Sequence, residues 1–482
     1  MEQTNRTDQY VSPFSTRYTS VEMKELFSDD WKFSTWRKIW LEVARGQKRL
    51  GVSMISDEQI LEMSSHLLDI DYSLAAKLEK EYRHDVIAHM HTFGKACPLA
   101  APIMHLGLTS CCVTDNAEMI QMRDGLHMLI KKLAKCLHRL LLFADNYSGL
   151  PTLGFTHIQS AQPVTVGKRA CMWLQDLTVH LLALEEITSG LKFRGLKGAT
   201  GTQASMLKLF DGNEKAVFDL ELYFARIFGF ADRIWPITGQ TYPRLVDTQI
   251  LQALACLAAS IHKIFLDLRL LQHLKEIEEP FEKNQKGSSA MAYKRNPMRG
   301  ERACAIARHV AVLPTEALMT QALQIFERTL DDSAGRRIYI PEAFLATDAL
   351  LIICQNVFEG LVVHPRVIEK HLAEELPFMA TEEIIVAMVE AGHDRQEVHE
   401  KLVIMAQEAG FRVKDLGASN QLMEMIGKDS FFAPIHSQLK DLLDAHRFIG
   451  RSKEQTESFL NEVVSILRMY PEATEGKSEL KV

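Results

Sequence analysis

One apolar pattern limits the fold of this chain more than any other feature. Between residues 250 and 271, apolar residues recur at alternating steps of four and three, namely Ile250, Leu254, Leu257, Ile261, Ile264, Leu268 and Leu271. Such steps place side chains on one face of an α-helix, and a stripe kept for three heptads is typical of long helices packed together. The pattern predicts a helix over residues 248–276, which would be roughly 40 Å long at the usual rise per residue.

Other segments of the chain show the same helical spacing. Apolar residues follow it over 117–144, 167–189 and 301–328, whereas the period-two patterns of strands are scarce. We therefore predict an all-α protein with a central bundle of long helices. Of the 482 residues, 1–110 are predicted to form an N-terminal helical domain, 111–363 the long-helix bundle and 364–482 a C-terminal helical domain.

The apolar arc of the predicted bundle helices is wide. The pairs Ile250–Leu251 and Leu257–Ala258 and the run 264–266 would cover two faces of one helix. A single chain need not bury both faces, which favours a homo-oligomer that packs bundles together. The alternative is a helix that is buried on all sides in a monomer.

Composition excludes several classes of protein. The chain has 55 basic and 62 acidic residues, a net charge of −7, and a protein that coats nucleic acid would normally be basic. Its eight cysteines are scattered without a CxxC pair, which fits neither a disulfide framework nor a zinc site. Met1–Tyr10 is polar, unlike a signal peptide, and no run of about 18 apolar residues could span a membrane. We expect a reduced, soluble, cytoplasmic protein.

The segment GSSAMAYKRNPMRGER, residues 287–302, is the most informative polar interruption. Its glycines, serines and proline predict a loop, and it concentrates positive charge around a single acidic residue, Glu301. The basic residues in and next to it are Lys286, Lys294, Arg295, Arg299 and Arg302. A mobile loop that carries cations suits closure over an anionic substrate. A solvated basic loop between helices is the alternative.

Two further polar segments contain candidate functional residues. His157 lies in TLGFTHIQSAQPVTVGKR, and a histidine titrates near neutral pH, so it can act as a general acid or base or be a hydrogen-bonded structural residue. In the segment 83–116, His84 and His89 are five apart, and HExxH is absent, which disfavours a metal site. Thr109 and Ser110 precede a helix expected to start near Asp115. They could bind a carboxylate or phosphate there, or simply cap the helix.

A third segment, ERTLDDSAGRR at 327–337, could clamp a phosphate because guanidinium groups match its oxygens. Arg328, Ser333, Arg336 and Arg337 are its candidates. Asp331 and Asp332 could instead neutralise these arginines in surface ion pairs. Arg17 and Tyr18, in STRYTS, give a similar but weaker indication. No GxxxxGK[ST], GxSxG or strand-linked GxGxxG motif occurs, so a nucleotide cofactor is not indicated.

Three of these segments occur together and in order: TSCCVTDN, GFTHIQSAQP and GSSAMAYKRNP. In this the chain resembles the fumarase/aspartase superfamily. STRY, RHDV, KRNPMR and ERTLDDSAGRR make it similar, over essentially its whole length, to the adenylosuccinate lyase family and especially to its animal-type branch. Ala292 and Ser160 depart from this pattern, since proline is common at both positions.

The resemblance implies a mostly helical, three-domain subunit in a homotetramer whose active sites each draw on three subunits. It implies β-elimination of fumarate from adenylosuccinate, giving AMP, and from the succinyl-carboxamide imidazole ribotide of purine synthesis, giving its free carboxamide. No cofactor and no metal are implied. The reaction removes a proton from a carbon next to a carboxylate, so fixed positive charge and hydrogen bonds should supply the largest part of the catalysis.

The resemblance also implies roles for individual residues. Ser288 would be the general base and His157 the general acid, with Glu301 orienting that histidine. Lys294 and Asn296 would hold the substrate carboxylate, and His84 would support phosphate binding or positioning. The other implied substrate contacts are Arg17, Tyr18, Arg83, Asp85, Thr109, Ser110, Thr156, Gln240, Arg302, Arg328, Ser333 and Arg337.

Two other functions stay open from the sequence. Another fumarate-releasing lyase of the superfamily, such as an argininosuccinate lyase, would keep the reaction type, but the RHD and ERTLDDS segments disfavour it. A catalytically silent structural protein of the same fold is disfavoured by the intact Ser288, His157, Lys294 and Glu301.

Overall fold

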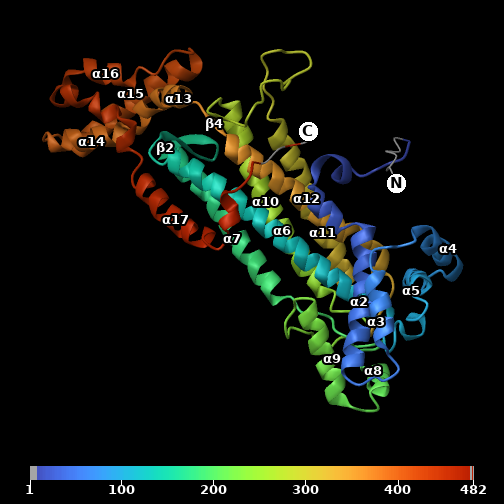
Figure 1. Cartoon of the computed structure of the whole chain (residues 1–482). Helices are drawn as coiled ribbons and strands as arrows, with labels where there is room; N and C mark the ends of the chain where they lie inside the picture. The colour runs from blue at the N-terminus through green and yellow to red at the C-terminus, as the bar shows by residue number, and fades with distance from the viewer. Residues whose placement is uncertain (1–7, 478–479, 481–482) are drawn as a thin grey trace.

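The structure is a computed structural model, and it describes residues 8–477 and 480. Residues 1–7, most of the polar Met1–Tyr10 segment, lie outside the described residues. The molecule is elongated, with long helices side by side along its length (Figure 1). These are α6 (Ser110–Asn146), α7 (Val166–Gly190), α10 (Leu245–His273), α11 (Met298–Ala322) and α12 (Asp332–Gly360). The predicted all-α fold with a central long-helix bundle is confirmed.

The apolar stripe forms the centre of this bundle. All seven of its residues are buried on α10, which begins three residues before the predicted segment and ends three residues before its end. The inference of an oligomer from the wide apolar arc rested on a wrong premise. Ile250–Leu251, Leu257–Ala258 and Ile264–Phe265 are all buried within the chain itself, and of the residues named for this arc Leu266 alone is substantially exposed, at 44%.

Shorter helices cover one end of the bundle. The N-terminal elements there are α1 (Val21–Leu26), α2 (Asp29–Arg49), α3 (Asp57–Ser65), α4 (Tyr72–Tyr82), α5 (Asp85–Ala96) and η2 (Ala101–Ile103), whereas η1 (Phe14–Tyr18) packs on α12 further along the bundle. They are joined there by α8 (Ala204–Leu209) and α9 (Glu214–Ile227). Most of their buried apolar residues belong to the same hydrophobic cluster as the bundle.

The C-terminal region has a second, smaller core. It is built from α13 (Pro365–Met379), α14 (Thr381–Glu390), α15 (Arg395–Asp415), α16 (Leu422–Lys428), η3 (Ser430–Gln438), η4 (Asp441–Leu443) and η5 (Ala445–Arg447). After it, α17 (Ser452–Leu467) and η6 (Pro471–Thr474) return to pack against α6, with α17 also contacting α7. The domain boundaries near 111 and 364 stay predictions.

Two short antiparallel pairs interrupt the helices. β1 (Pro151–Thr156) and β2 (Gln159–Thr165) form a hairpin between α6 and α7, which the sequence analysis did not predict. β3 (Ile277–Glu278) pairs with β4 (Val362–Val363), which follows α12. By length and hydropathy, α12 is the one helix among the described residues that could cross a membrane, and 72% of its most apolar window is buried.

Candidate active site

One group of predicted residues surrounds a cavity of about 280 Å³ at the bundle end where α6 and α12 begin. We call it the α6–α12 pocket. The predicted residues that line it are His84, Asp85, Ser110, Gln240, Arg328, Ser333, Arg336 and Arg337. They come from segments more than 200 residues apart, and the fold gathers here about half of the substrate contacts that the resemblance implied.

Hydrogen bonds join two helix N-termini at this pocket. His84 caps α5, its Nδ1 accepting the Ile87 N–H at 3.5 Å, and its Nε2 lies 3.3 Å from Ser110 Oγ. Thr109 is the N-cap of α6 and accepts a hydrogen bond from Gln240 Nε2 at 3.2 Å. The expected start of this helix near Asp115 was therefore wrong, because Ser110 is already its first residue. The positive end of the helix dipole favours an anion at this N-terminus.

Two arginines of the pocket are held by neighbouring side chains. Arg337 Nη2 donates to Asp85 Oδ2 at 2.6 Å, and Arg328 Nη1 donates to Cys111 Sγ. Burial would raise the pKa of Asp85, but the Arg337 guanidinium more than offsets it and lowers that pKa. Arg83, also predicted as a contact, is an exposed left-handed C-cap of α4 and does not line this pocket.

A buried network of charges underlies the pocket, and the sequence analysis missed it. Arg244 contacts Asp115 at 3.1 and 3.2 Å and Asp332 at 2.8 Å. Arg336 contacts Asp247 at 2.7 Å and also pairs with Glu118. The surface-pair alternative was thus wrong for Asp332, which is 1% exposed. Arg336 is 5% exposed and lines the pocket while paired with Asp247 and Glu118, so its assignment to the phosphate clamp stays a prediction.

Burial alone would raise the pKa of Asp115, but the arginines around it, Arg244 first, hold that pKa below its usual value. Burial raises the pKa of Glu118 in the same network. No local pattern identifies such a network, because its members lie on three helices or their ends, α6, α10 and α12, and meet only in the fold.

The signature loop, residues 287–297, forms a second group and projects from the opposite end of the bundle. Ser288 Oγ accepts hydrogen bonds from the N–H groups of Ala290 at 3.3 Å and Met291 at 3.1 Å. A Cβ atom on Gly287 would lie 1.9 Å from the Lys294 carbonyl oxygen, so glycine is needed where the two arms of the loop meet. Lys294 is exposed, and Asn296 is half-buried.

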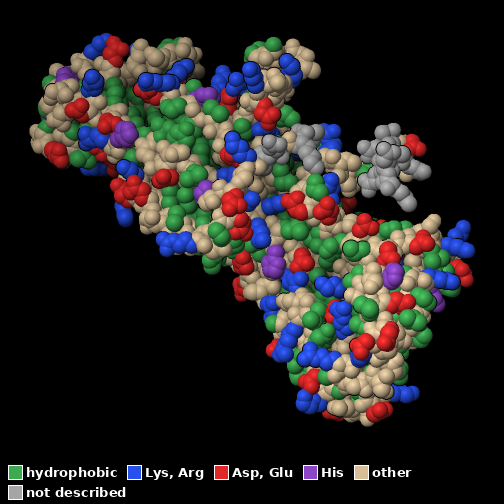
Figure 2. Space-filling model, in the orientation of Figure 1, with side chains coloured by type: hydrophobic (Ala, Val, Ile, Leu, Met, Phe, Trp, Pro, Cys, Tyr) green, Lys and Arg blue, Asp and Glu red, His purple; other side chains and the backbone are tan. Residues whose placement is uncertain are grey.

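The root of the signature loop is firmly bound to the bundle. Glu279 accepts the N–H groups of Arg299 at 3.1 Å and Gly300 at 2.9 Å, in the first turn of α11. Arg299 in turn donates to Glu282 at 2.7 Å and to Asn356 at 2.6 Å. Figure 2 shows the loop as a protrusion with Lys and Arg side chains around its base. A fixed root and an exposed tip fit a loop that closes over a ligand.

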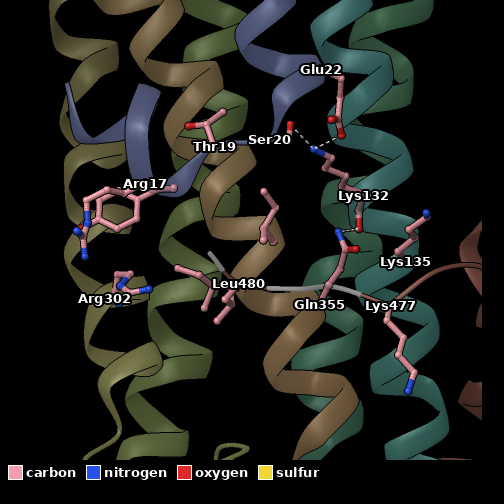
Figure 3. Close-up of a pocket in the computed structure, with 13 residues that line it drawn as sticks. Arg17, Thr19, Ser20, Glu22, Lys132, Lys135, Arg302, Gln355, Lys477 and Leu480 are labelled. Atoms are coloured by element: carbon pink, nitrogen blue, oxygen red, sulfur yellow. Dashed lines mark hydrogen bonds and ion pairs between the residues drawn. The ribbon is translucent and has the colours of Figure 1, made fainter. Parts of the chain in front are cut away.

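A second cavity, of about 260 Å³, contains Arg17, Tyr18 and Arg302. The Arg302 guanidinium lies 5.4 Å from the centre of the Tyr18 ring. In Figure 3, Arg17 and Arg302 lie on one side of this cavity and Lys132, Lys135 and Lys477 on the other, with Leu480 between them. These lysines were not predicted from the sequence, because they lie on α6 and in the C-terminal tail without any local motif.

His157 forms the third group, at the tip of the β1–β2 hairpin. Thr156 pairs with Gln159, so His157 and Ile158 are the two loop residues, with φ angles of 53° and 60°. Two positive φ angles define a type I′ turn, which usually takes Asn and Gly. For a residue other than glycine, the left-handed conformation costs roughly 1–2 kcal/mol. A β-branched residue such as isoleucine is unusual in this conformation. Thr156, His157 and Ile158 are exposed.

The length of the helices separates these groups within one chain. α6 has 37 residues, roughly 55 Å at the α-helical rise, with Ser110 at its start and the His157 hairpin after its end. α11 likewise separates the signature loop, before its start, from Arg328, after its end. No hydrogen bond or ion pair joins His157 to Ser288 or Glu301 within residues 8–477 and 480. The predicted pairing of Glu301 with His157 is therefore not formed within one chain.

The described part of the chain contains no group of three or more His, Cys, Asp or Glu side chains arranged to hold a metal ion. The chemistry that these three groups offer comprises a hydroxyl, an ammonium group, an imidazole and several guanidinium groups. Such a set can bind a multiply charged anion and transfer protons.

Comparisons with known proteins point to one family. Residues 74–311 match a family model described as Lyase, and residues 377–459 match one described as Adenylosuccinate lyase C-terminus. Curated adenylosuccinate lyases from Schizosaccharomyces pombe and Saccharomyces cerevisiae are each 50% identical to this chain, over 95% of the chain and 95% of each relative. The enzyme from Schistosoma mansoni is 48% identical over 98% of this chain and 99% of its own.

Solved structures share the fold at lower identity. A fumarate lyase from Mesorhizobium sp. BNC1 superposes with a TM-score of 0.78 at 24% identity, covering 94% of this chain and 99% of that one. A 3-carboxy-cis,cis-muconate lactonizing enzyme from Pseudomonas putida gives a TM-score of 0.80 at 22% identity, covering 95% and 99%.

Proposed function

The chain belongs to the adenylosuccinate lyase family, and from this premise we propose that it releases fumarate by β-elimination from succinylated purine precursors. Adenylosuccinate would give AMP, and the succinyl-carboxamide imidazole ribotide would give its free carboxamide. The observation that carries this proposal is the 50% identity to curated adenylosuccinate lyases over nearly the whole length. The sequence-based resemblance to this family is confirmed.

The first chemical step is the removal of a proton from the carbon next to a carboxylate. The resulting carbanion places a second negative charge on that carboxylate, and Lys294 and Asn296 would stabilise it. Ser288 would accept the proton. Its hydroxyl is a weak base unless its alkoxide is stabilised, so we propose that loop closure brings Lys294 and other cations close to it.

The second step breaks the carbon–nitrogen bond. His157 would donate a proton to the leaving nitrogen, which makes the amine a better leaving group. The arginines of the α6–α12 pocket would hold the phosphate end of the substrate, which is remote from the reacting bond. Binding energy gained there can position the succinyl arm and favour closure of the site.

We further propose a homotetramer whose active sites combine groups from different subunits. The separation of the three groups by the length of the bundle supports sharing, because a small substrate cannot contact both ends of α6. The bundle also exposes apolar side chains that association would bury. They include Met172, Val179 and Leu182 on α7 and Val312, Leu318 and Met319 on α11.

An ultraviolet assay of the purified protein tests the proposed reaction. Adenylosuccinate, the succinyl-carboxamide ribotide and argininosuccinate are supplied in parallel, and fumarate is measured in each reaction. We expect fumarate from the first two substrates and none from the third. Fumarate from argininosuccinate alone, or from none of the three, would overturn the proposal.

A further inference from the structure

We propose that Arg169, in the first turns of α7, is a positioning residue that holds the hairpin bearing His157 in its productive place. This inference rests on the proposed function, in which His157 is the general acid. Arg169 does not touch the reacting atoms. It would act on the strands that carry His157.

The hairpin needs such support because its tip adopts an unfavourable conformation. Both residues of its turn have positive φ angles, although neither is glycine. The pairing of β1 and β2 is also irregular at Gly154, between Leu153 and Phe155, where a Cβ atom would lie 2.4 Å from the Gln162 carbonyl oxygen. A bulged, two-stranded hairpin with a strained turn is not rigid by itself. Its geometry must be fixed by contacts with the rest of the molecule.

Arg169 makes these contacts at the point of the irregularity. Its Nη2 donates a hydrogen bond to the Leu153 carbonyl oxygen, and its guanidinium group lies 5.9 Å from the centre of the Phe155 ring. Leu153 and Phe155 flank Gly154, so one side chain of α7 contacts the hairpin on both sides of the bulge. A planar guanidinium can donate and stack at the same time, which a lysine ammonium cannot.

Arg169 also interacts electrostatically with Glu276, in the segment that leads to the signature loop. Its Nη1 is buried and has no hydrogen-bond partner, and Glu276 is the carboxylate that attracts Arg169 most strongly. Glu276 directly precedes β3, is 1% exposed, and its Oε1 lies 2.8 Å from His371 Nδ1 on α13. Its Oε2 likewise has no partner. The side chain that contacts the hairpin is thus attracted by a buried carboxylate of the segment that leads, through β3, to the signature loop.

The chemical consequence concerns proton transfer rather than binding. A general acid must lie within hydrogen-bond distance of its acceptor, and a misplacement of about 1 Å can cost roughly a hundredfold in rate. The α6–α12 pocket would be unaffected, since it lies at the other end of α6. Loss of Arg169 should therefore lower kcat and leave KM nearly unchanged.

The experiment compares Arg169→Met with a matched control, Arg123→Met, in the full-length protein. Arg123 on α6 makes the same pair of contacts, a hydrogen bond to a carbonyl oxygen, that of Phe228, and a guanidinium 4.7 Å from an aromatic ring, that of Phe230. It lies far from the hairpin. We expect kcat to fall roughly 10- to 100-fold in Arg169→Met, with KM changed less than about threefold, and to stay near the parent value in the control. Arg169→Lys should restore little.

A double variant separates positioning from a merely structural role. If Arg169 acts through His157, adding Arg169→Met to His157→Ala should lower kcat no further. Additive losses, or equal losses in the Arg123→Met control, would overturn the inference. Should Arg169→Met fail to fold, Phe155→Leu removes only the stacked ring, and we expect it to lower kcat several-fold with the same lack of additivity. An unchanged kcat in Phe155→Leu would then overturn it.

The two single variants distinguish a failure of the proposed function from a failure of the inference about Arg169. If His157→Ala keeps nearly full activity, the role of His157 in the proposed function is wrong. If His157→Ala is inactive while Arg169→Met keeps nearly full activity, the proposed function stands and the inference about Arg169 is wrong.

Discussion

At the scale of single residues, the Ser288 hydroxyl accepts two backbone N–H groups of its own loop. Within residues 8–477 and 480, no hydrogen bond joins it to another part of the fold. Ser288→Ala should therefore leave the thermal midpoint and substrate binding nearly unchanged, while kcat falls about a thousandfold, as expected for loss of a catalytic base. Turnover near the parent rate would remove this serine from the role of base. Calorimetry and steady-state kinetics on one preparation provide both measurements.

Arg337 should act on binding rather than on chemistry. Its side chain is 53% exposed at the α6–α12 pocket, where it contacts Asp85. Arg337→Met removes a charge-assisted contact with the substrate phosphate, which is worth about 1.5–3 kcal/mol, so KM should rise roughly 10- to 100-fold with kcat little changed. Arg366→Met is the control, because Arg366 forms only an exposed pair with Glu369. A fall in kcat at constant KM would contradict this assignment.

At the scale of elements, the close approach of the two arms of the signature loop depends on Gly287. An added methyl group would meet the Lys294 carbonyl oxygen, so Gly287→Ala should force the two arms of the loop apart. We expect kcat to fall at least about tenfold, because catalytic groups tolerate little displacement, without loss of thermal stability. Gly410→Ala on α15 is the control, since nothing lies within 4 Å of its added Cβ. Equal kinetics in both variants would show that the loop does not need this close approach.

The packing of α2 against α5 predicts a dependence of stability on pH. The His89 ring stacks on Phe33 with a centroid distance of 3.6 Å, and burial lowers the pKa of His89 to about 4. In the unfolded chain His89 binds a proton near pH 6.5, so above that pH the buried neutral ring makes its full contribution to the free energy of unfolding. As the pH falls towards 4, this contribution is lost progressively, and the free energy of unfolding decreases by roughly 3 kcal/mol.

His89→Phe keeps a ring of similar size and removes the proton-binding site. The urea midpoint of this variant should fall less between pH 7 and pH 4.5 than that of the parent protein. His91→Gln changes an exposed position on the same helix and should leave the pH dependence unchanged. A parent-like pH dependence in His89→Phe would contradict the prediction.

The long helices were predictable because apolar residues recur at helical spacing along one face of each of them over many residues. The stripe from Ile250 to Leu271 is long enough to leave little ambiguity. The β1–β2 hairpin was not predictable in the same way. Its strands have six and seven residues, they contain Gly154 and Pro163, and the hairpin turn is His157–Ile158 instead of a glycine turn.

The same contrast applies to the candidate site. The residues of the α6–α12 pocket were found because they lie in recognisable segments, and the fold then brought them together. Asp115, Glu118 and Asp247 were missed as members of a charge network, because their partners Arg244 and Arg336 are distant in sequence. Arg169 was likewise missed, since its importance lies in two contacts that no local pattern encodes.

At the scale of the whole molecule, the length of the bundle determines how a site can form. The chain carries the arginines of the α6–α12 pocket at one end. At the other end its proposed acid and base lie on two separate projections, the β1–β2 hairpin and the signature loop, and no hydrogen bond joins them among the described residues. A complete site then requires neighbouring subunits that place the end of one bundle beside the opposite end of another. Symmetric oligomers of long-helix bundles can satisfy this requirement.

Mixing two inactive variants tests this account most directly. Ser288→Ala and His157→Ala are each inactive by expectation, and subunit exchange between them is verified by mass before the assay. If acid and base come from different chains, random assembly should restore activity to about one quarter of the parent rate, the share of sites with both side chains intact. No recovery after verified exchange would show that a single chain supplies both groups and would contradict the account.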